Sequence, residues 1–256
     1  MAGGGRGQAR ARGGARHDRA RRRRPADDRD RDVNLLGLDT STAACAVCVA
    51  RSDGEVFEVV PSVEELFAPP AHSRDLLPRA AEVLERAGLE YADLDAVAVG
   101  IGPGTFTGLR VGIATARALA GANGLEVRPV SSLRALAEGI DAPARLPLID
   151  ARRGELFAAL YDSSGAELLA PFVTPPEDAA QTALARSANP LAAGDGSLRF
   201  RGLLEAAGVR VAPDGAQVHV VRGLHICRLA AGTKPVPAEA VLPTYIRAPD
   251  ARPASP

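Results

Sequence analysis

The 256-residue sequence contains few cysteines and no long uninterrupted hydrophobic run. Its three cysteines are too few for a disulfide framework, which indicates a reducing compartment. The most apolar N-terminal stretch, residues 33–50, is interrupted by polar residues 39–42, so it is no membrane-spanning helix of roughly 20 apolar residues. Arg21–Arg24 are followed by a proline and acidic residues, where a secretion signal requires an apolar segment. We therefore expect a cytoplasmic protein with no membrane partner.

The sequence also lacks a recognisable set of metal ligands. Two ligands on one helix face need the spacing i, i+4, which does not occur among the histidines, His17, His72, His219 and His225. Cys45 and Cys48 fall in a predicted strand, where residues three apart point to opposite faces. We expect these cysteines to be structural, and the chain to bind no metal and no cofactor of its own.

The net charge is zero, but it is unevenly distributed along the chain. Residues 1–32 contain 11 Arg and 5 Asp, with scarcely any apolar side chain, and the rest of the chain is acidic. Such a segment buries too little surface to offset its chain entropy, so we expect a disordered tail. An RNA-binding arm is one interpretation. The other interpretation is a solvated extension, or a start codon that was assigned too far upstream. This interpretation is favoured because the tail has no aromatic residue for stacking on bases.

From residue 33 onward the apolar pattern predicts alternating strands and helices. The order is β-β-β-α-β-α-β, with an antiparallel meander first, and the elements are Val33–Asp39, Ala43–Arg51, Glu55–Val60, Ser73–Ala87, Ala96–Ile101, a helix ending near Ala120, and Leu125–Val130. Pro78 is tolerated only in a first turn, so the regular helix should begin a little after Ser73, whose hydroxyl would cap it. His72, just before this helix, is a candidate partner contact.

After a linker, the chain repeats the same order of strands and helices with a weaker apolar pattern. Its elements are expected at Leu146–Asp150, Glu155–Tyr161, Ala166–Val173, Pro176–Ala185, Leu191–Ala193 and Leu198–Ala207. A last helix, roughly Val218–Ala231, precedes a proline-rich extended end. The repeat divides the chain into a tail (1–32), an N-terminal lobe (33–131), a C-terminal lobe (132–216) and a C-terminal helix with an extended end (217–256).

The strongest local motif is the glycine-rich segment Gly100–Gly112. Glycines at a strand end that opens a helix leave backbone N–H groups free to hold an anion. The spacing from Gly102 differs from the dinucleotide motif, however, and Leu109 stands where a P-loop has lysine. An anion site and a tight turn with close helix-to-sheet packing both fit this segment. Arg152 and Arg153 could likewise contact RNA phosphate or be ordinary exposed arginines.

Four segments of the chain resemble the TsaB family. They occur in the family's order and spacing, and they are Leu38–Val47, His72–Pro78, Gly102–Ala120 and Ile149–Ala159. The likeness spans roughly residues 33–250. The resemblance implies an α/β fold with two ribonuclease-H-like lobes and mixed sheets, as in actin and the sugar kinases. It also implies a role in making threonylcarbamoyladenosine next to the anticodon of tRNA.

The resemblance further implies a non-catalytic subunit that binds the homologous catalytic subunit TsaD, with the ATPase TsaE joining them. The catalytic relative's His-x-x-x-His pair is absent here, which also disfavours a metalloprotease. Asp39–Thr42 has serine where actin-like kinases need glycine for phosphate to approach, so Asp39 is interpreted as a turn residue. A stand-alone phosphotransferase or ATPase and a tRNA-binding module acting through the tail are the alternatives. Direct tRNA contacts, and a homodimer in the absence of the partner, stay open.

The helix Gly108–Ala120 predicts where the partner binds. Its sheet-facing arc should contain Gly108, Gly112, Ala116 and Ala120, with Leu109, Ile113 and Leu119. The opposite arc is far less polar than a solvated face, and a helix that is apolar nearly all round is normally buried on both sides. An isolated lobe has nothing left to cover that arc. We therefore expect a TsaD-like partner to bind residues of both helices, namely Leu77, Ala81, Leu84, Glu85, Arg110, Val111, Ala114, Arg117 and Ala118.

Removing residues 1–32 should leave the melting temperature nearly unchanged, because a disordered segment adds no buried area. Calorimetry of the full chain and the shortened chain measures this difference. A fall of several degrees would mean that the tail packs against the lobes.

Overall fold

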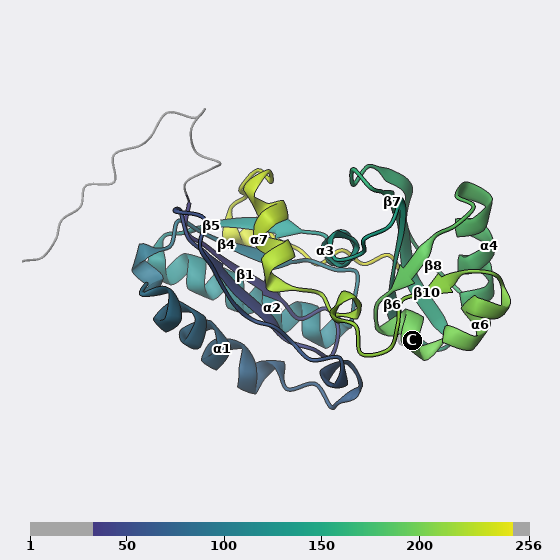
Figure 1. The fold of residues 1–256 in the computed structure, drawn as a ribbon. Coiled ribbons are helices and arrows are strands. Elements are labelled where there is room, and N and C mark those ends of the chain that lie inside the picture. Colours follow the sequence, from purple (N-terminus) through teal and green to yellow (C-terminus); the bar gives the residue numbers. More distant parts are fainter. Residues whose placement is uncertain (1–32, 248–256) are drawn as a thin grey trace, which may run out of the picture.

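The computed structural model describes residues 33–247, which fold into two lobes side by side (Figure 1). The predicted tail, residues 1–32, lies outside the described residues. None of the described helices has the length and apolar character needed to cross a membrane.

The first lobe is built on a five-stranded sheet in the order β3-β2-β1-β4-β5. The strands β1, β2 and β3 form the predicted antiparallel meander, and β4 and β5 are parallel to β1. In chain order the elements are β1 (Leu35–Asp39), β2 (Ala46–Ala50), β3 (Val56–Val59), α1 (His72–Ala87), β4 (Ala96–Gly100), α2 (Phe106–Asn123) and β5 (Glu126–Val130). The predicted order of elements is therefore confirmed in this lobe.

The second lobe repeats this arrangement in a sheet of order β10-β9-β6-β7-β8. Its elements are β6 (Ala144–Arg152), β7 (Glu155–Asp162), β8 (Glu167–Thr174), α4 (Pro176–Arg186), β9 (Leu191–Ala193), α5 (Asp195–Arg199), α6 (Arg201–Ala206) and β10 (Arg210–Val211). In both lobes the first strand is central, an antiparallel pair lies on one side of it, and parallel strands lie on the other. This confirms the α/β fold with two ribonuclease-H-like lobes.

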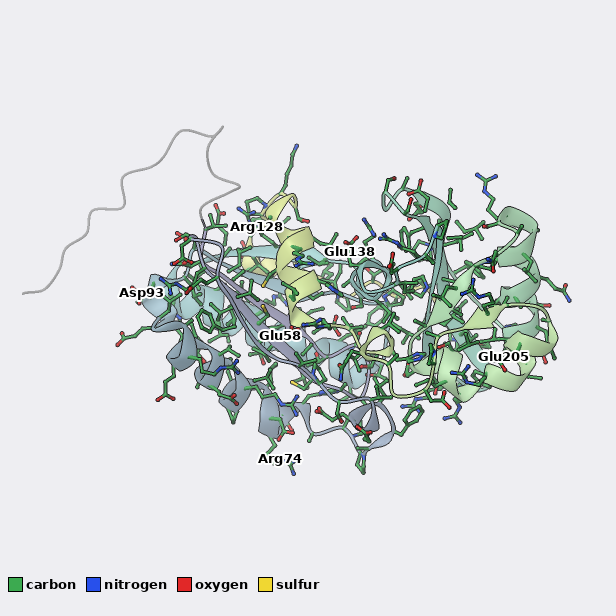
Figure 2. The ribbon with its side chains drawn as sticks, viewed as in Figure 1. Glu58, Arg74, Asp93, Arg128, Glu138 and Glu205 are labelled. Atoms are coloured by element: carbon green, nitrogen blue, oxygen red, sulfur yellow. The ribbon has the colours of Figure 1, made fainter. Side chains whose placement is uncertain are left out.

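Two short helices, α3 (Ser132–Glu138) and α7 (Gly223–Ala231), lie between the two sheets. A single hydrophobic cluster joins them to strands of both lobes. Glu58 on β3 is labelled in Figure 2. Its carboxylate accepts a hydrogen bond from the N–H of Leu224 in the first turn of α7 and pairs with Arg222. Helix α7, predicted as part of a separate C-terminal unit, thus completes the core of the first lobe.

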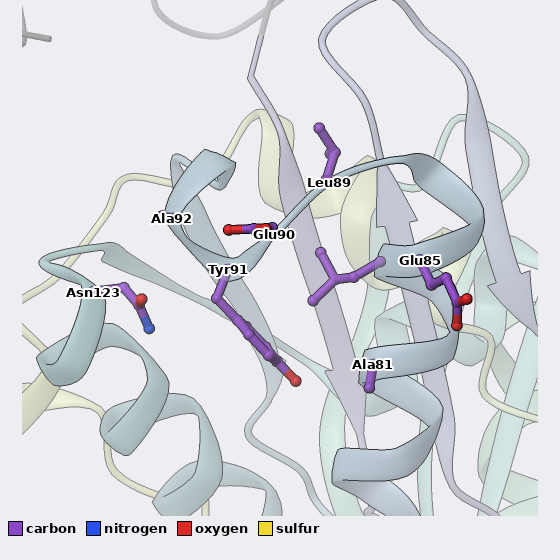
Figure 3. A pocket seen from close by; sticks show the side chains of 8 residues that line it. Ala81, Glu85, Leu89, Glu90, Tyr91, Ala92 and Asn123 are labelled. Carbon is purple, nitrogen blue, oxygen red and sulfur yellow. The ribbon is translucent and has the colours of Figure 1, made fainter. Parts of the chain in front are cut away.

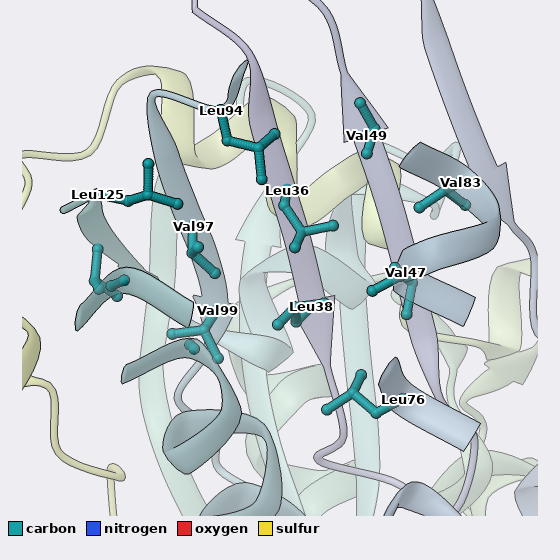
Figure 4. Packing of buried hydrophobic residues seen from close by; sticks show 14 of the residues in the cluster. Leu36, Leu38, Val47, Val49, Leu76, Val83, Leu94, Val97, Val99 and Leu125 are labelled. Atoms are coloured by element: carbon teal, nitrogen blue, oxygen red, sulfur yellow. The ribbon is translucent and has the colours of Figure 1, made fainter. Parts of the chain in front are cut away.

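The opposite face of the first sheet is covered by α1 and α2 (Figure 4). Alternate residues of β1 point this way, so Leu36 and Leu38 are fully buried against the helices. Each such side chain contributes about 1.5–3 kcal/mol through burial. Cys45 packs in this cluster and Cys48 in the cluster on the other face, and both are free thiols. The prediction that the two cysteines point to opposite faces is confirmed.

Several predicted details of α1 are wrong. Pro78 lies inside the helix rather than in its first turn, and the residue before the helix is Ala71, with no side-chain cap from Ser73. The helix continues through Pro78 because the residues around it, Leu76 and Ala80, stay buried against the sheet. Leu77, one of the predicted interface residues, is 50% exposed.

Two predicted helices are shorter than expected, and several short elements were not predicted. The helix expected at Leu198–Ala207 is broken at Phe200, whose side chain packs into the core of the second lobe. The last helix begins at Gly223, because the ring of His219 is held by hydrogen bonds to the backbone around Gly194 and Pro213. Helix α3 and strand β10 were missed.

Gly112→Ala and Gly121→Ala should change stability in opposite directions, although both lie in α2. A Cβ on Gly112 would overlap the side chain of Thr40, whereas one on Gly121 meets nothing within 4 Å. We expect Gly112→Ala to lower the free energy of unfolding by about 1–3 kcal/mol. Gly121→Ala should raise it by about 0.5–1 kcal/mol. Urea denaturation checks both values, and equal effects would contradict the close contact with Thr40.

Candidate functional site

The candidate partner site is the outer surface of α1 and α2, defined by the exposed residues Leu77 and Ala81 of α1 and Ala114 and Ala118 of α2. The two helices lie next to each other on one face of the first sheet (Figure 1). Glu85 is also exposed, at the side of this surface. The buried arc of α2 is the predicted one, except that Leu119 is only half-buried.

The structure places the other predicted interface residues differently. Leu84 is 3% exposed and belongs to the core, because it faces the sheet together with Val83. Val111 is half-buried against the same core. The guanidinium of Arg110 lies 3.7 Å from the ring centroid of Phe106, and Arg117 donates hydrogen bonds to main-chain carbonyls of the C-terminal segment.

This C-terminal segment, residues 233–247, covers part of the arc that was expected to be open. The N–H of Val236 donates to the carbonyl of Val127, and the N–H of Thr244 donates to the carbonyl of Ile101. Tyr245 stacks on Phe106 with 5.7 Å between ring centroids. We expected that nothing in the lobe covers this arc. The C-terminal segment covers Arg117 and part of Arg110, so the expectation is wrong for these two residues. It holds for Ala114 and Ala118, which are exposed.

A pocket of about 530 Å³ lies at the far end of the outer surface (Figure 3). Its wall combines the end of α1, including Leu84, with the turn before β4 and the end of α2. The lining side chains labelled in Figure 3 include Ala81, Glu85, Tyr91 and Asn123. Burial raises the pKa of Tyr91. The pocket joins three predicted interface residues, Ala81, Leu84 and Glu85, to residues that the sequence analysis did not predict.

The loop after β1 has a structural role that explains the glycine-rich segment. Asp39 accepts hydrogen bonds from the backbone and hydroxyl of Ser41 and from the hydroxyl of Ser132, as predicted for a turn residue. Gly104, Gly108 and Gly112 lie so close to Thr40 and Ser41 that a Cβ on any of them would clash. These glycines permit close packing of α2 on the loop.

A second cavity, of about 810 Å³, lies between the lobes. It is lined by the start of α2, by Arg152 at the end of β6 and Arg153 after it, and by residues 244–247. Both arginines have positive φ angles, 63° and 56°. Arg152 pairs with the buried carboxylate of Asp150, as does Arg199. His72 also lines this cavity, so it does not lie on the outer surface as a partner contact would.

Within residues 33–247 no group of three or more histidine, cysteine or acidic side chains has the geometry of a metal site. His219 and His225 are buried, and each ring bonds to backbone groups. Burial lowers the pKa of both histidines.

The chain is similar to known proteins. The family model described as "TsaD: tRNA N6-adenosine threonylcarbamoyltransferase" matches residues 59–202. The chain is 36% identical over 133 residues to "tRNA threonylcarbamoyladenosine biosynthesis protein TsaB" of Escherichia coli, covering 50% of this chain and 55% of that protein. It is 38% identical over 129 residues to the protein of the same name from Haemophilus influenzae, covering 49% and 52%. The chain thus spans about half the length of the curated relatives it matches.

A solved structure gives a longer match. A Pseudomonas aeruginosa protein, described as uncharacterized with similarity to peptidase YEAZ, is 32% identical to the chain, with a TM-score of 0.70. The superposition covers 84% of this chain and 100% of that one. YeaZ is another name for TsaB.

Asp195→Asn should remove part of the pH dependence of stability. Burial raises the pKa of Asp195 from its usual 3.8 to about 6, although the side chain accepts hydrogen bonds from the N–H groups of Asp150 and Gly196. The folded protein therefore binds this proton more tightly than the unfolded chain does, and stability falls as the pH rises from about 4 to about 6. Above that window the loss, about 2–3 kcal/mol, is complete. Asparagine keeps an acceptor oxygen without the charge.

Urea unfolding of wild type and Asp195→Asn at several pH values measures this effect. As the pH rises from about 4 to about 6, the free energy of unfolding of the wild type should fall relative to that of Asp195→Asn. A constant difference would contradict the raised pKa.

Proposed function

The chain belongs to the TsaB family, and from this membership we propose that it is the non-catalytic subunit of a complex that forms threonylcarbamoyladenosine in tRNA. In this proposal a TsaD-like catalytic subunit binds the outer surface of α1 and α2, and a TsaE-like ATPase joins the pair. The observation that carries the proposal is the exposed apolar strip formed by Leu77, Ala81, Ala114 and Ala118.

The composition of this strip favours contact with another helix. Leu77 is 50% exposed, and the other three residues are alanines, whose small side chains let a second helix approach closely. Charged residues lie along one border of the strip, with Arg74 pointing into solvent in Figure 2. An apolar centre with a charged rim is the usual anatomy of a protein interface.

The C-terminal segment forms the other border of the strip. It places Leu242 and Tyr245, which are 66% and 43% exposed, beside the first turns of α2, where Phe106 is 53% exposed. Aromatic residues with an adjacent arginine, here Arg110, are enriched among the residues that dominate binding energy. We propose that the partner contacts these side chains as well as the alanines.

The packing of the loop after β1 supports a docking role rather than phosphoryl transfer. Thr40 and Ser41 are buried, and their main chain is pressed against the glycines of the α2 segment. A loop held in this way cannot wrap around a phosphate group in the manner of a kinase. The packed loop therefore favours the subunit role over a stand-alone phosphotransferase.

Ala118→Glu should weaken association with a TsaD-like subunit by several kcal/mol while leaving the chain folded. Ala118 is exposed, so the variant's circular dichroism and melting temperature should stay close to wild type. In the complex the carboxylate would be buried without a partner, which is costly. Titration calorimetry with the purified TsaD-like protein measures the affinity.

Ala185→Glu is the matched control, because Ala185 is an exposed helical alanine on α4 of the second lobe. This variant should bind as wild type does. If Ala118→Glu unfolds the protein, Ala118 belongs to the core, and if both variants bind normally, the partner does not use the outer surface.

A further inference from the structure

The pocket at the far end of the outer surface is not used by the contacts proposed above. Its volume is about 530 Å³, and alanines and leucines of α1 and of the turn before β4 form its apolar part, namely Ala81, Leu84, Leu89 and Ala92. The ring of Tyr91 extends from the turn toward Ala81 (Figure 3). Because Ala81 belongs both to this pocket and to the exposed strip, a partner on the strip reaches the pocket.

The charged and amide groups that line the pocket are hydrogen-bond acceptors, and no basic side chain of the described residues lines it. Glu85 supplies a carboxylate from α1, and Glu90 supplies another from the turn. The side-chain N–H of Asn123 donates to the carbonyl of Leu119 at 2.9 Å, which leaves the side-chain oxygen as an acceptor. Such a lining favours an occupant that is a cationic donor.

Neither carboxylate is neutralised by a basic side chain in the described part of the chain. The residue next to Glu85 is Arg86, and it pairs with Glu82 instead. The side chain of Glu90 accepts one backbone N–H within its own turn, which leaves its charge in place. Residues 33–131 contain 13 acidic and 7 basic residues, so the lobe as a whole is also negative. An incoming cation is therefore attracted to this end of the outer surface.

An arginine side chain combines the properties that this lining requires. Its methylene stem packs on apolar side chains while its charged head stays at the rim. Its planar guanidinium stacks on an aromatic ring and donates several hydrogen bonds, whereas the ammonium of lysine is a compact point charge. The pocket shares Ala81 and Glu85 with the predicted interface, so a helix docked on the strip carries such a side chain within reach.

We propose that the partner of the outer surface inserts an arginine side chain into this pocket, with its stem on Leu84 and Leu89 and its guanidinium between Glu85 and Tyr91. This role of the pocket rests on the proposed docking of a TsaD-like subunit. It adds a charged anchor to the apolar contacts of the strip, at the end opposite to Phe106. A single ion pair at one end fixes the direction and the register of the partner's helix along α1.

Glu85→Gln removes one carboxylate of the pocket at nearly constant size. Glu85 is exposed in the free chain, so the melting temperature should stay close to wild type. The variant should bind the purified TsaD-like protein about tenfold more weakly in titration calorimetry, because the guanidinium loses its charged partner. Glu82→Gln is the matched control, since Glu82 is also exposed on α1 but does not line the pocket. It should stay within about threefold of wild type.

The same assay separates this pocket from the docking surface as a whole. Equal affinities of Glu85→Gln and Glu82→Gln would overturn the arginine pocket, and a loss of binding by Ala118→Glu would still leave the docking surface standing. If Glu85→Gln and Ala118→Glu both bind as wild type does, the partner does not use the outer surface and both proposals fail. They also fail if the wild type does not bind the TsaD-like protein.

A double-mutant cycle identifies the inserted side chain. Each arginine of the TsaD-like protein is replaced in turn by methionine, and its affinity is measured for wild type and for Glu85→Gln. One replacement should weaken binding to wild type about tenfold and binding to Glu85→Gln by no more than about threefold. If every replacement has the same effect on both chains, no arginine of the partner occupies the pocket.

The arginine-rich residues 1–32 of this chain are the alternative occupant. Removing them should leave the difference in affinity between wild type and Glu85→Gln unchanged. If the pocket held this segment instead, the removal and Glu85→Gln would each raise the affinity for the TsaD-like protein, because both would free the end of the outer surface. That outcome would overturn the assignment of the pocket to the partner.

Discussion

The buried carboxylate of Asp39 is the interaction on which the arrangement of this protein depends. It receives hydrogen bonds from Ser41 in the loop that follows β1 and from Ser132 at the start of α3. Gly100, on the neighbouring strand, makes room for it, because a Cβ there would overlap the carboxylate. Burial raises the pKa of Asp39, and the hydrogen bonds oppose that rise. One side chain thus ties the central strand of the first lobe to the helix that leads into the second.

The position of this loop in turn sets the position of α2. Thr40 and Ser41 contact the helix where it carries glycines, and the small residues allow α2 to lie close to the sheet. The same helix supplies alanines to the outer surface and its first turn to the cavity between the lobes. The outer surface and the cavity between the lobes therefore share one helix, at different faces and different ends.

The sequence predicts the order of strands and long helices because their apolar periodicity reflects a core that each lobe builds locally. It misses α3, a seven-residue helix with most of its residues buried, because two turns are too short for an apolar periodicity to be recognised. It assigns Leu84 to the partner interface, although Leu84 is 3% exposed, because helical periodicity cannot locate the edge of a buried face. The contacts of Arg110 and Arg117 depend on residues 238–245, more than a hundred positions away, for which no periodic pattern exists.

The path of the C-terminal segment has a consequence for the order in which the chain is made. Val241 is a core residue of the first lobe, and α7 covers the second face of that lobe's sheet. During synthesis from the N-terminus, the strands of the first lobe leave the ribosome long before the residues that finish its core. The lobe translated first is therefore among the last parts to be completed, and the two lobes mature as one unit.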